Sequence, residues 1–131
     1  MKIFIYKKVN YSVDESKIQK AVEAVFVKAK LSPKSEASVA IVSHKQMIKY
    51  AKEYMKDSDE EAKTHPVLSF PTAELEGSFV FPPDKINHIG EIIVSYEKSQ
   101  EYAQKEGKSV NQVIADLAEH GALHLVGIHH D

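Results

Sequence analysis

The chain has 131 residues, of which 43% are hydrophobic and 27% charged, values that are ordinary for one globular domain spanning 1–131. It has no run of about 18 apolar residues and no apolar leader, so the sequence predicts no membrane span and a cytoplasmic location. The net charge of -2 is unlike the basic balance typical of nucleic-acid-binding domains, and the lack of cysteine excludes disulfides and thiolate metal ligands.

Strand and helix patterns alternate through the first half of the chain. Residues 3–6 are apolar and predict a strand, and apolar residues repeat at spacings of three and four over 14–30, which predicts a helix with one buried face. A second strand is expected at 38–43. The run Ser43-His44-Lys45-Gln46 then has the form of a capping box and predicts a helix that ends near Met55.

The second half begins with a polar, acidic segment at 56–63, which we interpret as a solvated loop. The remaining elements are expected in this order: a strand at 67–70, a loop or irregular hairpin at 72–85, a strand at 86–95, and helices at 96–106 and 109–126. The apolar run Ile92-Ile93-Val94 is continuous, which favours a strand buried on both faces. Together these elements predict an α/β (α+β) fold with a single mixed sheet of about four strands packed with four to five helices.

Four of the seven histidines lie in the last twelve residues of the chain. His120 and His124 are four residues apart, so on a helix both imidazoles project from one face and can reach one metal ion. Gly127 allows the helix to end and the chain to turn, which brings His130 back towards the same ion. Three neutral nitrogens and one open position are the arrangement of a catalytic zinc site.

The histidine spacing matches the metzincin peptidase motif H-E-x-x-H-x-x-G-x-x-H, except that Gly121 stands where the peptidases have their general base. The missing glutamate argues against peptide hydrolysis by that mechanism. His129 competes with His130 as the third ligand, and we favour His130 because of the motif spacing. The other histidines have no partner at ligand spacing, so His44 and His65 are expected at the surface and in a loop.

Three segments together resemble the YbeY family, the bacterial metal-dependent endoribonucleases of ribosomal RNA maturation. The run from His120 to His130 is similar to the family's H-G-x-L-H-L-x-G-x-x-H, and Val67-Leu68-Ser69-Phe70-Pro71 is similar to its V-L-S-F-P. Ile89-Gly90-Glu91-Ile92-Ile93-Val94-Ser95 resembles L-G-D-I-x-I-S, with glutamate in place of aspartate. The three segments occur in the family's order.

The resemblance implies a zinc-dependent endoribonuclease that is selective for single-stranded RNA, acts on ribosomal RNA and has the small ribosomal subunit as a partner. It implies one Zn²⁺ per chain, held by His120, His124 and His130. No proton acceptor is fixed by the sequence; Glu91, His129, Asp131 and a second water are the candidates, with Glu91 first. The alternatives are a zincin-like peptidase and a non-catalytic ribosome-associated protein whose zinc is structural.

The chain departs from the family at the end of the second predicted helix, where family members usually carry a Tyr-Arg pair. The matching residues here are Tyr54-Met55, and the chain contains no arginine. If the family arginine binds RNA phosphate, that role is vacant or passes to Lys52, Lys56 or Lys63.

Overall fold

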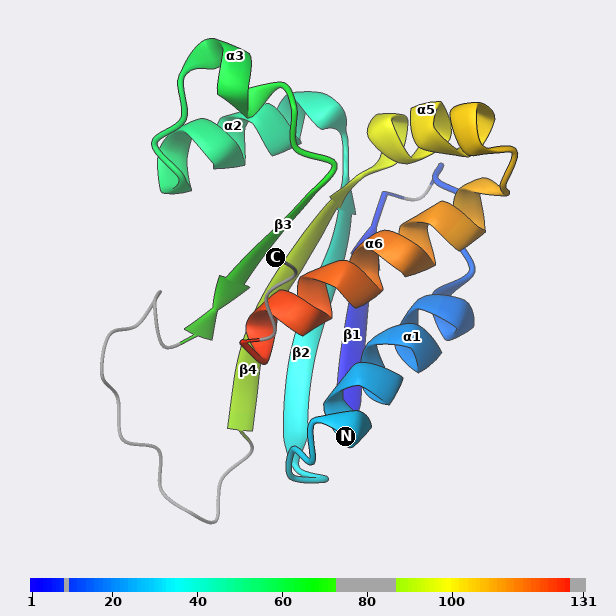
Figure 1. Ribbon diagram of the computed structural model, residues 1–131, viewed down its shortest axis with the longest axis vertical. Helices are drawn as coiled ribbons and strands as arrows, with labels where there is room; N and C mark the ends of the chain where they lie inside the picture. Colours follow the sequence, from blue (N-terminus) through cyan, green and yellow to red (C-terminus); the bar gives the residue numbers. More distant parts are fainter. Residues whose placement is uncertain (9, 73–86, 128–131) are drawn as a thin grey trace.

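The computed structural model describes residues 1–8, 10–72 and 87–127, so most of the loop expected at 72–85 lies outside the described residues (Figure 1). In chain order the elements are β1 (Lys2–Lys7), α1 (Glu15–Lys28), β2 (Ser35–Val42), α2 (His44–Tyr54), α3 (Asp59–Ala62), β3 (Val67–Pro71), β4 (Asn87–Ser95), α5 (Tyr96–Glu106) and α6 (Val110–Leu125). None of these helices is both long and apolar enough to cross a bilayer.

The four strands form one mixed sheet in the order β1-β2-β4-β3. The first three run parallel, and β3 pairs antiparallel with β4 at the edge of the sheet. The prediction of a single mixed sheet packed with helices is therefore confirmed. Parallel strands need long crossovers, and these are made by α1 between β1 and β2 and by the segment with α2 and β3 between β2 and β4.

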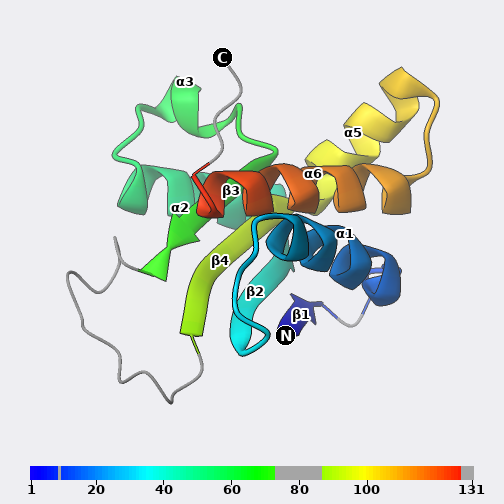
Figure 2. The same ribbon diagram turned by 60° about the horizontal axis from the view of Figure 1, so that its bottom comes forward.

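Helices cover both faces of the sheet, as Figures 1 and 2 show. Helices α1 and α6 pack together on one face, where they bury alternate residues of β2 and β4, among them Val39, Ile41, Ile92 and Val94. Helix α2 packs on the other face, where Met47 and Ala51 meet Ile93, Leu68 and Phe70. The continuous apolar run of β4 is thus divided between two cores, as its pattern predicted.

Serine caps set the starts of four described helices, α2, α3, α5 and α6. The hydroxyl of Ser43 accepts a hydrogen bond from the Gln46 N–H at 3.2 Å, and Ser109 accepts one from Gln112 at 3.1 Å, so both predicted starts are confirmed. The Gln112 side chain donates forward to Asp116 at 2.8 Å. The sequence Ser58-Asp59-Glu60-Glu61 forms a complete capping box at the start of α3, so the interpretation of 56–63 as a loop without helix was wrong.

Helix α6 crosses β4 at very close range because Gly121 has no side chain. Gly121 is buried, and a Cβ atom there would lie 2.7 Å from Cγ2 of Ile92, a side chain that is itself fully buried. The helix then ends near Gly127, whose φ of 81° is the left-handed conformation that favours glycine. The predicted end of the last helix is confirmed.

We expect Gly121→Ala to lower the free energy of unfolding by roughly 1 to 2 kcal/mol, because overpacking against Ile92 outweighs the better helix propensity of alanine. Thermal and urea unfolding measure this difference. In an Ile92→Ala background the clash is gone, and the same Gly121→Ala change should be neutral or stabilising by up to about 1 kcal/mol. A destabilisation of equal size in both backgrounds would contradict the close packing described here.

Candidate metal centre

His120 and His124 project from the last turns of α6 towards one point. Their Nε2 atoms are 3.0 Å apart, and their rings meet edge to face with centroids 4.6 Å apart. Two nitrogens that each lie about 2.0 Å from one tetrahedral zinc ion are about 3.3 Å from each other, so the observed separation is close to that of two ligands on one ion. The helical spacing therefore places two of the predicted ligands as a metal site requires.

The third predicted ligand, His130, lies outside the described residues, as do its alternative His129 and the candidate proton acceptor Asp131. Within 1–8, 10–72 and 87–127, no group of three histidine or carboxylate side chains could hold a metal ion. Asp116, one turn before His120, is engaged elsewhere: its carboxylate accepts from Gln112 at 2.8 Å and from Lys108 at 3.4 Å. Completion of the site would therefore fall to the segment that follows Gly127.

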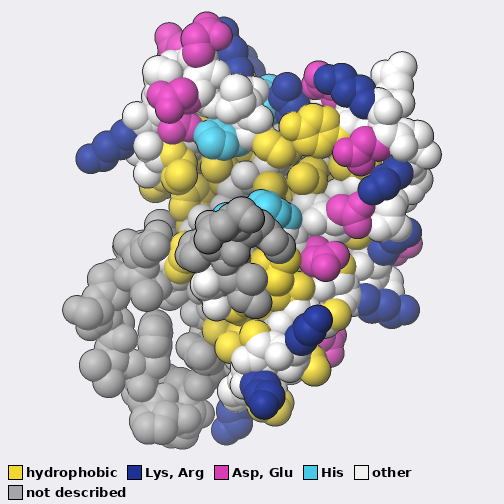
Figure 3. Space-filling model, in the orientation of Figure 1, with side chains coloured by type: hydrophobic (Ala, Val, Ile, Leu, Met, Phe, Trp, Pro, Cys, Tyr) yellow, Lys and Arg dark blue, Asp and Glu magenta, His cyan; other side chains and the backbone are white. Residues whose placement is uncertain are grey.

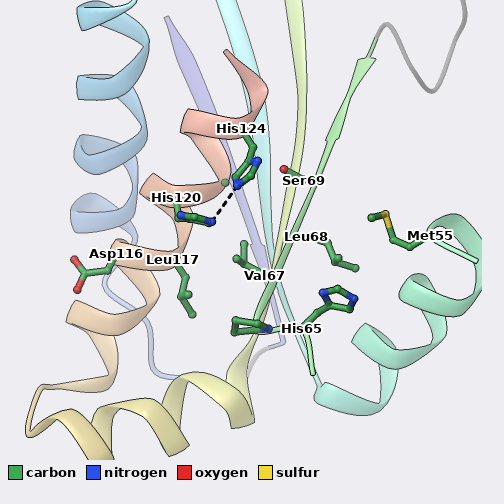
Figure 4. A pocket seen from close by; sticks show the side chains of 11 residues that line it. Met55, His65, Val67, Leu68, Ser69, Asp116, Leu117, His120 and His124 are labelled. Atoms are coloured by element: carbon green, nitrogen blue, oxygen red, sulfur yellow. Dashed lines mark hydrogen bonds between the residues drawn. The ribbon is translucent and has the colours of Figure 1, made fainter. Parts of the chain in front are cut away.

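The histidine pair lines a cleft of about 660 Å³ between α6 and β3 (Figure 4). The α6 wall is formed by Asp116, Leu117, His120, Gly121 and His124, and the opposite wall by Met55, His65, Pro66, Val67, Leu68 and Ser69. Figure 3 shows histidine and hydrophobic side chains gathered on this face of the molecule. Among these described lining residues there is no lysine.

Glu91, the first candidate for a proton acceptor, does not join the histidine pair. Side chains alternate along a strand, and Ile92 faces α6, so its neighbour Glu91 faces the α2 side of the sheet. There it pairs in register with Phe70 of β3 and lines a separate pocket with Tyr50 and Tyr54. The structure thus separates Glu91 from His120 and His124 by the thickness of the sheet.

The position of the family arginine is taken by Met55, whose side chain lines the cleft. Lys52 forms an ion pair with Asp59 at 2.6 Å, and Lys63 lies 3.7 Å from Glu60. The pKa of Asp59 is lowered by its hydrogen bond to Lys52. No lysine proposed as a substitute for the arginine lines the described cleft.

His65 and Asp57 form a pair that no pattern in the sequence indicates. The Nε2 atom of His65 lies 2.6 Å from Oδ2 of Asp57, and the two side chains are 30% and 13% exposed. His65 lies in the loop between α3 and β3, as expected, and from there it also lines the cleft. The two residues are eight positions apart, a spacing that matches no helical or strand repeat. The contact is therefore visible only once the path of the chain between α2 and β3 is known.

His44 also differs from the expected surface histidine. Its Nδ1 atom lies 2.9 Å from the hydroxyl of Ser95, and its Nε2 atom lies 2.9 Å from the carbonyl oxygen of Lys63. The ring therefore joins the start of α2 to the end of β4 and to the segment after α3. His44 has a structural role in this region and does not line the cleft.

Comparison with known proteins identifies relatives over nearly the whole chain. A family model described as Endoribonuclease YbeY matches residues 4–131. A protein named Endoribonuclease YbeY from Renibacterium salmoninarum is 30% identical over 131 residues, which cover 100% of this chain and 81% of the relative. Its namesake from Caldicellulosiruptor saccharolyticus is 34% identical over 137 aligned residues, covering 99% of this chain and 85% of the relative.

One solved structure has the same fold. The solution structure of a protein from Thermotoga maritima superimposes with a TM-score of 0.56 at 19% sequence identity, covering 98% of this chain and 75% of that one. At this identity the similarity supports the arrangement of the sheet and helices alone.

Lys56, the residue before Asp57, has an unfavourable backbone conformation. This residue follows α2 with a φ of 54°, which is costly for a side chain that carries Cβ. We expect Lys56→Gly to raise the free energy of unfolding by about 1 kcal/mol, as measured by urea unfolding. Lys56→Ala removes the same charge and keeps Cβ, so it is the matched control and should bring no such gain.

Proposed function

The chain belongs to the YbeY family of endoribonucleases, and we propose that it is a zinc-dependent enzyme that cuts single-stranded RNA during ribosomal RNA maturation. The observation that carries the proposal is the pair of Nε2 atoms, 3.0 Å apart, at the wall of the cleft. The small ribosomal subunit as a partner and a cytoplasmic location rest on the family resemblance.

The residues of the chain suit zinc. The pair formed by His120 and His124 supplies two neutral nitrogen ligands at a suitable separation, and His130 completes the set in this proposal. With no cysteine in the chain, imidazole and carboxylate are the strong zinc ligands available. Zinc held there would supply Lewis-acid chemistry, because it acidifies a coordinated water and offsets negative charge on a phosphoryl oxygen.

The cleft suits a single strand of RNA. Its volume of about 660 Å³ is in the range of small-molecule sites and is large enough for a nucleotide. Val67, Leu68 and Leu117 give it apolar walls against which a ribose or a base can pack. Unpaired bases are the parts of RNA that side chains can reach most easily.

The peptidase alternative is disfavoured by the packing around Gly121. A glutamate at this position would be the general base of that mechanism. A Cβ atom alone would already lie 2.7 Å from Ile92, so the position has no room for a glutamate side chain. The buried glycine thus supports a reaction in which the proton acceptor comes from elsewhere.

The first test compares labelled single-stranded and double-stranded RNA with the zinc-loaded protein, with and without a chelator. We expect the single strand alone to be cut, and we expect both the chelator and His124→Ala to abolish cleavage. His88→Ala is the matched control, because His88 pairs with Glu36 at 3.3 Å outside the cleft and is 30% exposed. A protein that binds one zinc and cuts no RNA would instead indicate a structural zinc.

A second test identifies the third ligand by comparing His130→Ala with His129→Ala. We expect His130→Ala to weaken zinc binding by more than about 100-fold, since the loss of a ligand exceeds the effect of losing an outer-shell partner. His129→Ala should leave the affinity within about threefold of the unsubstituted protein, a difference below about 1 kcal/mol. Competition with a chromophoric chelator measures both values, and the reverse order would assign the ligand to His129.

A further inference from the structure

His65 stands across the cleft from the histidine pair. Figure 4 shows His65 and Met55 on the side opposite His120 and His124, with Val67 and Leu68 between the two sides. A phosphodiester that lies between the two walls would have the histidine pair on one side and His65 on the other. The chemistry available on that far side depends on which of the His65 nitrogens carries a hydrogen.

The contact with Asp57 fixes the role of one ring nitrogen. An ionised carboxylate only accepts hydrogen bonds, so Nε2 of His65 donates to Oδ2 of Asp57 across their 2.6 Å separation. Nδ1 is then the nitrogen that can carry and release a second hydrogen. An imidazole oriented by a carboxylate in this way is the arrangement used for proton transfer in many hydrolases.

Both members of the pair are held by the fold. Asp57 is only 13% exposed, and the left-handed Lys56 turns the chain after α2 so that the N–H of Asp57 approaches the carbonyl oxygen of Ala51 at 3.4 Å. On the other side, the carbonyl oxygen of Pro66 accepts a hydrogen bond from Ser95 at 2.9 Å, which ties the residue after His65 to the end of β4. The carboxylate that holds the imidazole and the backbone that follows His65 are therefore both fixed by the fold.

The described lining of the cleft offers few other proton donors. It contains no lysine, and the thioether of Met55 cannot donate. The carboxylate of Asp116 is an acceptor and is already bonded to Gln112 and Lys108. Apart from the histidine pair, this leaves the hydroxyl of Ser69 and the ring of His65, and of these two only imidazole releases a proton readily near neutral pH.

We propose that His65 is a catalytic general acid that protonates the leaving oxygen of the RNA, and that Asp57 is its positioning residue. This inference rests on the proposed function. Displacement at phosphorus proceeds with the attacking and leaving oxygens roughly in line, so an attack from the side of the histidine pair directs the leaving oxygen towards the opposite wall. His65 lies on that wall.

The step balances with water as the nucleophile. The water oxygen forms a bond to phosphorus and the bond between phosphorus and the leaving ribose oxygen breaks, with its electron pair passing to that oxygen. The hydrogen on Nδ1 of His65 moves to the leaving oxygen, which departs as a hydroxyl group. The water's proton passes to solvent, and His65 regains a proton from solvent, so the products are a phosphomonoester and an alcohol.

The test compares two substrates that differ in their need for an acid. A ribose oxygen must be protonated to leave, whereas bis(p-nitrophenyl) phosphate releases p-nitrophenolate without a proton. We expect His65→Ala to lower kcat on single-stranded RNA by about 100-fold, the usual contribution of a general acid, and to change hydrolysis of the nitrophenyl ester by less than about threefold. Added imidazole should restore part of the RNA cleavage by His65→Ala, and Asp57→Asn should show the same substrate dependence to a smaller degree.

Three further measurements separate this role from a structural one. Zinc stoichiometry and RNA affinity in the presence of a chelator should be unchanged in His65→Ala, as in the control His88→Ala. Thermal unfolding should show that His65→Ala is fully folded at the assay temperature, although Asp57 loses its hydrogen-bond partner. An equal loss of kcat on both substrates, or a change in KM alone, would overturn the assignment of His65 as the general acid. Cleavage by His65→Ala at the unsubstituted rate overturns this role and leaves the proposed function intact, whereas an inactive unsubstituted protein overturns both.

Discussion

The close approach of α6 to β4 at Gly121 determines where the site lies. Because no Cβ separates the helix from Ile92, the last turns of α6 rest directly on the sheet, and the histidine pair is carried to the edge where β3 runs antiparallel. Here β3 supplies the opposite wall of the cleft, so the width of the cleft is set by the distance between the helix and the strand. A glycine in the middle of a helix usually lowers the stability of the helix, and here this loss is offset by the close packing against Ile92.

Much of the fold follows from local patterns in the sequence. Helix periodicity, serine caps and the buried run of β4 each depend on residues close together in the chain, and each was confirmed. Helix α3 was missed although Ser58 and Glu61 have capping-box spacing, because the acidic composition of the segment was taken to indicate a solvated loop. An acidic composition indicates that a segment is exposed to solvent. An exposed segment can still be helical when side chains accept hydrogen bonds from its first backbone N–H groups.

The site was predictable only in part. The spacing of His120 and His124 is a local helical property, and their approach within hydrogen-bonding distance follows from it. The side of the sheet on which Glu91 lies cannot be read from the local sequence. Alternation along a strand shows which residues share a face, but it does not show against which face α6 packs. The contact between His65 and Asp57 likewise depends on how the segment after α2 returns to β3, which no periodicity records.

Helix α6 follows the sheet strands in sequence, yet it packs against α1 and completes the core that begins with Ile3 of β1. During synthesis the inner faces of β2 and β4 are therefore covered by α1 alone until nearly the whole described chain has left the ribosome. A nascent chain that stops before α6 exposes apolar strand surface, which makes it prone to aggregation and a target for proteases. The histidine pair lies on the same helix that closes the core, so a chain that stops before α6 lacks both this cover of the sheet and the two histidines.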